Sequence, residues 1–136
     1  MTAEPARVDE LLDAARQAMD RAYAPYSHFH VGAAILADGR VFTGQNIENA
    51  SYPVSVCAER NAVGRMIDAG VREIEAVAVV TAADVPTPPC GACRQVLWEF
   101  GPGCSVTCAT TAGARETWAL ADLLPHAFGP RDLLDR

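Results

Sequence analysis

The sequence contains no lysine, so its eleven basic residues are all arginines, set against seventeen acidic residues. The formal net charge is −6 and the sequence pI is about 4.9. Proteins whose main partner is DNA or RNA usually gather basic residues to neutralise phosphates. These arginines are scattered among acids, and we therefore expect no nucleic-acid partner.

Long apolar runs are also missing. The apolar stretches are short and are broken by charged or turn residues, so we expect no membrane-spanning segment and no membrane partner. Met1 to Arg7 lack the basic start and following apolar run of a secretory signal. These absences favour a cytoplasmic protein.

Internal repeats, low-complexity stretches and linkers are absent as well. The 136 residues are 50% hydrophobic and 21% charged, which is an ordinary balance for a globular chain. This length suits one hydrophobic core. We expect a single catalytic domain that spans residues 1–136.

The hydrophobic pattern predicts alternating helices and strands. Apolar residues recur at helical spacing from Val8 to Arg21, and alternation from Phe29 to Ile35 predicts a strand. Asp38-Gly39 predicts a hairpin turn into a second strand. The other expected elements are the strand Val41 to Asn46, a helix from Val56 to Ala69 capped by Ser55, a buried strand from Glu73 to Thr81, a helix from Cys90 to Phe100, a strand from Ser105 to Thr110 and a short helix from Ala119 to Leu124. This order indicates an α/β fold, a three-layer α/β/α sandwich with a mixed central sheet.

Five cysteines are an odd number, and without an export signal they indicate metal or redox chemistry rather than disulfides. Cys90 and Cys93 are three residues apart, so they share one face of a helix and can chelate one ion. Cys57 could supply a third thiolate from the start of another helix. Three protein ligands with one open position are typical of catalytic zinc.

Charged residues flank these cysteines. Glu59 lies two residues after Cys57, which in a helix means roughly opposite sides, but at a helix tip the side chains can curl over the end. We expect Glu59 beside the metal, not bound to it. Backbone N–H groups of two helix N-termini, together with Arg60 and Arg94, could withdraw charge from the sulfurs.

The residues alone leave other interpretations open. Cys-Gly-Ala-Cys also suits a redox dithiol at a helix N-terminus. Cys104 or Cys108 could complete a structural four-sulfur zinc site. Cys57 could be a buried apolar residue, as free cysteines often are.

The segments Cys-Ala-Glu-Arg and Pro-Cys-Gly-Ala-Cys-Arg-Gln-Val-Leu together resemble the cytidine deaminase family, in its small tetrameric three-cysteine form. They are a variant of the deaminase signature His-x-Glu then Pro-Cys-x-x-Cys, with cysteine in the histidine position. Three further blocks are similar to the family's strand leading into the pyrimidine pocket, its nucleoside loop and its C-terminal motif: Tyr26 to Ala34, Gly44 to Tyr52 and Leu123 to Phe128. The resemblance covers nearly the whole chain.

The resemblance implies a site residue by residue. Cys57, Cys90 and Cys93 would bind one Zn²⁺ per subunit, and Glu59 would transfer protons. Arg60, next to the ligands in the sequence, would withdraw charge from the sulfurs without binding the metal. The implied substrate contacts are Phe29 against the nucleoside, Asn46 and Glu48 on the ribose hydroxyls, backbone groups of Ala58 and Cys90, and Tyr52 and Phe128 reaching into a neighbouring subunit's site. Such contacts imply a homotetramer with shared active sites.

The implied reaction is zinc-dependent hydrolytic deamination of cytidine and 2′-deoxycytidine to uridine and 2′-deoxyuridine, with release of ammonia, in pyrimidine salvage. The substrate would be a small nucleoside. Rival interpretations are a deaminase of another aminopyrimidine, a thioredoxin-like oxidoreductase using Cys90 and Cys93, and a structural zinc module. The chain also departs from the family at Thr87-Pro88-Pro89, where serine-proline is more usual.

Overall fold

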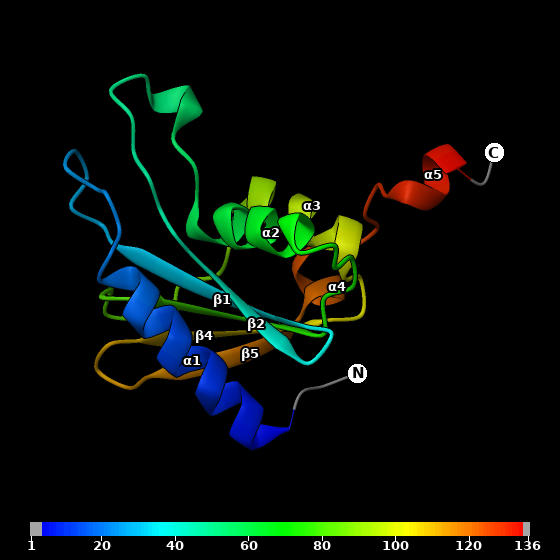
Figure 1. Ribbon diagram of the computed structural model, residues 1–136, viewed down its shortest axis with the longest axis horizontal. Helices are drawn as coiled ribbons and strands as arrows, with labels where there is room; N and C mark the ends of the chain where they lie inside the picture. The colour runs from blue at the N-terminus through cyan, green and yellow to red at the C-terminus, as the bar shows by residue number, and fades with distance from the viewer. Residues whose placement is uncertain (1–3, 135–136) are drawn as a thin grey trace.

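A five-stranded mixed sheet in the order β2-β1-β3-β4-β5 forms the middle of the protein (Figure 1). The computed structural model describes residues 4–134. β3 and β4 are parallel, and the other neighbouring pairs are antiparallel. The strands are β1 (Val31–Ala37), β2 (Arg40–Gln45), β3 (Ala76–Thr81), β4 (Ser105–Thr110) and β5 (Arg115–Ala119).

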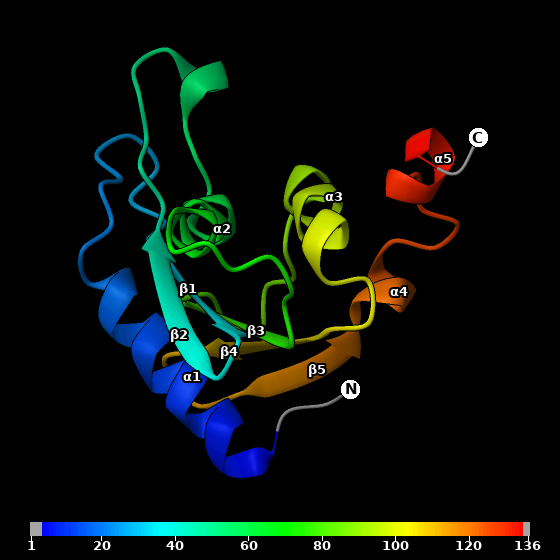
Figure 2. The same cartoon turned by 45° about the vertical axis from the view of Figure 1, so that its right-hand side comes forward.

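Helices cover both faces of this sheet. α1 (Pro5–Met19) packs on one face against β1, β2 and β3, whereas α2 (Ala58–Asp68) and α3 (Gly91–Phe100) lie together on the other face (Figure 2). The expected three-layer α/β/α sandwich is therefore confirmed. The short elements are a 3-10 helix (Tyr52–Val54), α4 (Leu120–Leu123) and α5 (Pro130–Leu134).

The β1–β2 hairpin turns where the sequence predicts. Ala37 pairs with Arg40, which leaves a two-residue loop. Asp38 and Gly39 have φ angles of 53° and 68°. Two consecutive positive φ angles are those of a type I′ turn, whose twist matches that of the flanking strands.

The central strands are buried on both faces. Ile35 and Val77 pack towards α2 and α3, whereas Ala34 and Ala78 pack towards α1. Every residue of β3 and β4 is buried. Burial on both faces explains why apolar residues occur at both parities along Ala76–Thr81.

The first turn of α2 lies directly on β2 because Gly44 has no side chain. A Cβ atom at Gly44 would lie 2.4 Å from the Ala58 carbonyl oxygen and 2.4 Å from the Ala62 nitrogen. No larger residue fits without moving the helix. Gly44 therefore allows the N-terminal part of α2, next to Cys57, to pack closely against β2.

Two local predictions were wrong. Ser55 does not cap α2, because Cys57 is the N-cap residue and the Ser55 hydroxyl accepts a hydrogen bond from Asn49 N at 3.0 Å instead. The sequence pattern also missed β5, whose side chains are mostly exposed. A polar edge strand has no apolar alternation to reveal it.

Within residues 4–134, none of the helices combines the length and the apolar character required to cross a membrane.

Candidate active site

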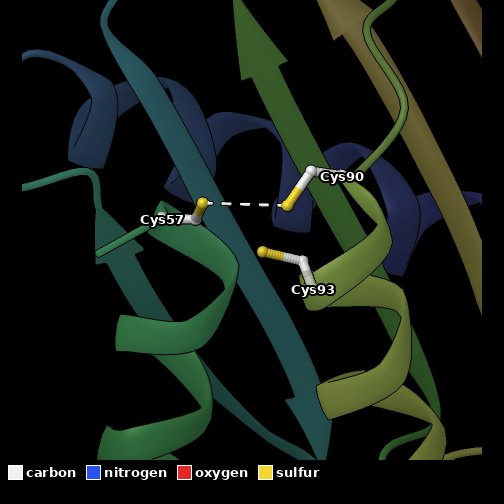
Figure 3. A group of neighbouring side chains, drawn as sticks. All are labelled: Cys57, Cys90 and Cys93. Carbon is white, nitrogen blue, oxygen red and sulfur yellow. Dashed lines mark hydrogen bonds between the residues drawn. The ribbon is translucent and has the colours of Figure 1, made fainter. Parts of the chain in front are cut away.

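Three of the five cysteines meet where two helices begin. Cys57 is the N-cap of α2, Cys90 is the N-cap of α3, and Cys93 lies in the first turn of α3. Their sulfur atoms all lie within 4.8 Å of one another and point into a common space (Figure 3). The Cys57 and Cys90 sulfurs are 3.9 Å apart. Cys57 thus joins Cys90 and Cys93 in one group, although it lies 33 positions before Cys90 in the chain.

The spacing of these sulfurs fits zinc. Tetrahedral coordination with Zn–S bonds of about 2.3 Å places two sulfurs about 3.8 Å apart. The observed 3.9 Å between Cys57 and Cys90 matches this value. Three thiolates leave one coordination position for water or substrate, as in catalytic zinc sites. The donor set therefore suits zinc with a free position.

The surroundings favour thiolates. Neither Cys57 nor Cys90 caps its own helix through its side chain, so first-turn N–H groups remain available near the sulfurs. Hydrogen bonds from the Cys93 thiol and then from Arg60 lower the pKa of Cys57 to about 5. The shared proton, with burial, raises the pKa of Cys93. Arg60 Nη2 lies 3.7 Å from the Cys57 sulfur, so its charge acts on this ligand as the sequence suggests.

Glu59 lies beside the sulfur group without joining it. Its side chain is only 5% exposed, and it lines a cavity together with Cys57 and Cys90. Burial raises the pKa of this carboxyl to about 7, with a further increase from Cys57 that Arg60 opposes. A carboxyl group with such a pKa can both accept and donate a proton near neutral pH. Because Cys57 precedes the helix, both side chains can serve one cavity.

This cavity has a volume of about 220 Å³ and receives six of the predicted site residues. They are Phe29, Asn46, Cys57, Ala58, Glu59 and Cys90. The lining also includes residues that the sequence analysis did not predict as site residues: Val31, Val79, Thr81, Thr87 and Pro88. In the sequence, these residues could have been recognised as cavity residues from their positions, which are at or near strand ends or just before a cysteine.

Glu48 and Tyr52 line a neighbouring cavity of about 290 Å³, together with Tyr26, Ser27 and Ser55. One Glu48 carboxylate oxygen accepts hydrogen bonds from the backbone N–H groups of Tyr26 and Ser27, at 3.0 and 3.1 Å. The other accepts one from the Ser27 hydroxyl, the main reason that the pKa of Glu48 is lowered. A carboxylate has about four acceptor positions, so one remains for a ligand.

Asn46 joins the two segments that flank the first cavity. Its side-chain nitrogen donates to the Phe29 carbonyl at 2.8 Å, and its side-chain oxygen accepts from Val31 N at 2.8 Å. These bonds replace sheet pairing at the start of β1, which explains why the strand begins at Val31 and not at Phe29. The amide keeps a second N–H, which is available to a ligand.

Tyr52 and Phe128 are exposed, at 70% and 56% of their surface. Phe128 belongs to the lining of neither cavity. Its backbone carbonyl accepts a hydrogen bond from Gln95 Nε2 at 2.8 Å, which ties the C-terminal segment to α3.

Arg94 does not act on the sulfurs as the sequence suggested. Its guanidinium donates to the backbone carbonyls of Pro89 and Leu123, at 2.7 and 2.8 Å. A side chain next to a ligand in sequence leaves α3 in another direction, so adjacency to Cys93 misled the prediction.

Cys104 and Cys108 stand apart from the sulfur group. Both are buried with the core residues of the sheet, and within residues 4–134 the metal-binding group contains only Cys57, Cys90 and Cys93. A closed four-sulfur structural site is therefore excluded. The redox interpretation also fails to explain why a third thiol and a buried carboxyl lie beside the Cys-Gly-Ala-Cys pair.

Comparison with known proteins gives the family. Residues 6–109 match the cytidine and deoxycytidylate deaminase zinc-binding region. The chain belongs to the cytidine and deoxycytidylate deaminase family. Among its relatives, the cytidine deaminase of Sporosarcina psychrophila is 45% identical over 128 residues, which cover 93% of this chain and 94% of the relative.

Solved structures of the deaminase family share the fold. The crystal structure of cytidine deaminase from Burkholderia pseudomallei superposes with a TM-score of 0.85 at 47% identity, over 88% of this chain and 98% of that one. The cytidine deaminase from Mycobacterium tuberculosis gives a TM-score of 0.77 at 43% identity, over 89% and 96% of the two chains.

Proposed function

We propose that this chain catalyses the hydrolytic deamination of cytidine and 2′-deoxycytidine to uridine and 2′-deoxyuridine, with release of ammonia. The observation that carries the proposal is the cavity lined by the buried Glu59 together with Cys57 and Cys90, two members of the sulfur group. The deaminases from S. psychrophila and B. pseudomallei support the choice of nucleoside. The proposed catalytic domain spans residues 1–136.

Cys57, Cys90 and Cys93 would hold one zinc ion per subunit. When bound, zinc supplies Lewis-acid activation of a water molecule. Arg60 stabilises the thiolate form of Cys57 through its hydrogen bond to that sulfur. The N-termini of α2 and α3 favour negative charge at the same place.

Glu59 would move the protons of the reaction. It accepts the two protons of the attacking water in turn, and delivers the first to N3 of the base and the second to the departing amino group. Water addition at C4 and loss of ammonia then replace the amino group with a carbonyl oxygen. One side chain can perform both transfers because its pKa lies at about 7 and water is largely excluded around it.

The proposed substrate contacts follow the two cavities. Phe29 packs against the nucleoside and the backbone of Ala58 bonds the base, whereas Asn46 and Glu48 bond the ribose hydroxyls. The linings of both cavities contain carboxylates and no arginine. An uncharged nucleoside fits such a lining better than a nucleotide, whose phosphate would be repelled.

We further infer a cytoplasmic homotetramer with shared active sites that serves pyrimidine salvage. The exposed rings of Tyr52 and Phe128 support this assembly, because each is available to a neighbouring subunit. Tyr52 packs edge-on against Tyr26, with ring centres 6.1 Å apart, beside the Glu48 cavity.

The decisive experiment incubates the zinc-loaded protein with cytidine, deoxycytidine and dCMP and measures ammonia together with the deaminated product. We expect equimolar products from the nucleosides and little from dCMP. Glu59→Gln should lower kcat on the order of 10³-fold, because the amide cannot transfer protons, with zinc content unchanged by metal analysis. No turnover of either nucleoside by the folded zinc protein would refute the proposal.

Phe128→Ala tests the shared site. The variant should raise KM for cytidine on the order of tenfold, since an aromatic contact is lost, while zinc content stays that of the wild type. An unchanged KM would remove Phe128 from the substrate contacts. Sedimentation velocity on the wild type reports the assembly directly, and a monomer that is fully active would contradict shared sites.

A further inference from the structure

The side chain of Arg94 joins two distant carbonyl groups beside the sulfur group. Its Nε donates to the Pro89 carbonyl at 2.7 Å, and its Nη1 donates to the Leu123 carbonyl at 2.8 Å. Pro89 immediately precedes Cys90, and Leu123 ends α4. The guanidinium therefore links the residue before a sulfur ligand to the C-terminal part of the chain.

The segment from Pro86 to Pro89, just before Cys90, has few hydrogen-bond donors of its own. Pro86, Pro88 and Pro89 have no backbone N–H to donate. Within residues 4–134, the Thr87 hydroxyl has two long contacts, at 3.4 Å to the Val85 carbonyl and 3.4 Å to the Thr81 hydroxyl. The hydrogen bond from Arg94 to the Pro89 carbonyl, at 2.7 Å, is therefore shorter than either contact of the Thr87 hydroxyl.

The hydrogen bond from Arg94 to the Pro89 carbonyl contributes more because both residues are at least partly buried. Pro89 is buried, and a buried carbonyl without a partner is costly. Arg94 is itself half-buried, where a charged donor to a carbonyl is stronger than at the surface. Only a planar fork with several N–H groups can serve both carbonyls at once, which a lysine ammonium on a flexible stem does poorly.

Cys90 depends on this arrangement more than the other two ligands. It is exposed, whereas Cys93 is buried within α3 and Cys57 is partly buried at the start of α2. Its backbone lies between the Pro89 carbonyl and the first turn of α3, where Arg94 N donates to the Cys90 carbonyl at 2.9 Å. The backbone bond is the ordinary first bond of α3, so the specific contribution of the Arg94 side chain is its bond to the Pro89 carbonyl, on the side of Cys90 away from the helix.

We propose that Arg94 is a positioning residue for the metal centre: by tying the Pro89 carbonyl to the Leu123 carbonyl, it holds Cys90 at the distance that a single ion needs. The inference rests on the proposed zinc site, and it does not require cytidine to be the substrate. It gives Arg94 a different task from Arg60, which bonds a ligand sulfur itself.

The test measures zinc affinity by competition with a chromogenic chelator, using Arg94→Gln and Arg94→Lys in the full chain. We expect Arg94→Gln to weaken zinc binding on the order of 10- to 100-fold, as loss of an outer contact to a ligand does. Arg94→Lys should lie between this variant and the wild type, because one ammonium cannot serve both carbonyls. In the Co²⁺-substituted proteins, the sulfur-to-cobalt absorption bands should weaken or shift in the same order.

Two controls separate positioning from general damage. Arg72→Gln also removes an arginine that bonds two backbone carbonyls, those of Ile67 and Val71, but at the far end of α2. Gln95→Ala cuts the neighbouring tie from α3 to the Phe128 carbonyl and leaves Pro89 untouched. Both should keep the zinc affinity and the cobalt spectrum of the wild type.

Zinc affinity within twofold of the wild type in a folded Arg94→Gln protein would overturn the inference, as would an equal loss in Gln95→Ala. If Arg94→Gln does not fold, Arg94→Lys decides by the same criterion. A protein that binds zinc in an Arg94-dependent way and fails to deaminate cytidine would refute the proposed function and leave this inference standing.

Discussion

The five cysteines of this chain divide into two groups with different surroundings. Cys57, Cys90 and Cys93 gather at two helix N-termini, and the pKa of Cys57 falls to about 5. Cys104 and Cys108 lie in the core, and burial raises their pKa values to about 11 and 12. The same side chain belongs in one place to a group that could hold a metal ion, and in the other it packs as a small apolar residue.

Backbone position makes this difference, more than depth of burial. Cys93 and Cys108 are both fully buried, yet only Cys93 has sulfur partners and sits in the first turn of a helix. Cys108 lies in the middle of β4, paired with Val79 of β3 and Glu116 of β5. A thiolate forms where N–H groups, Arg60 or an ion can stabilise it.

The largest expected difference between the groups concerns zinc itself. Cys57→Ala should abolish stoichiometric zinc binding and reduce deaminase activity to background, because two sulfurs hold zinc far more weakly than three. Cys108→Ala should retain one zinc per chain and lose about 1–2 kcal/mol of folding stability through the space left in the core. Atomic absorption and urea unfolding measure the two effects, and zinc loss in Cys108→Ala would break the distinction.

Thiol labelling tests the difference in accessibility between the two groups of cysteines. After zinc is removed with a chelator, iodoacetamide should label the exposed Cys90 within minutes, and bound zinc should protect it. Cys104 and Cys108 should react on the order of 10³-fold more slowly, because their sulfurs become accessible only when the protein opens. Mass spectrometry of peptides assigns each site. Rapid labelling of Cys108 in the folded protein would contradict the buried position.

The smallest expected effect is a loss of stability in alkali. The ordinary pKa of a thiol is 9.0, and the folded chain keeps the Cys108 proton to about 12, so between these pH values the unfolded chain binds fewer protons. Stability is therefore intact below pH 9 and falls as the pH rises. From pH 8 to pH 10 this thiol should account for about 1 kcal/mol. In Cys108→Ala, the free energy of unfolding measured with urea should fall less steeply between these pH values. An equal fall in the variant and the wild type would show that Cys108 does not cause it.

The sequence alone predicts most of the architecture because the core strands and helices carry strong patterns. The Asp38-Gly39 turn was placed correctly, and β4 was predicted at its observed bounds from its apolar residues. β5 was missed because its exposed residues, Arg115 to Thr117, form a strand only through pairing with β4. Its stabilisation is non-local, so no local pattern encodes it.

For the site, the sequence already contains the residue types that could act: three cysteines at predicted helix starts and a glutamate two residues after the first. Cys57 meets Cys90 and Cys93 because α2 and α3 pack side by side on the sheet, and the same packing places Glu59 in one cavity with Cys57 and Cys90. The tertiary structure also separated the two arginines, since the direction of a side chain depends on what its helix packs against. Arg60 turns to a sulfur and Arg94 to two carbonyls.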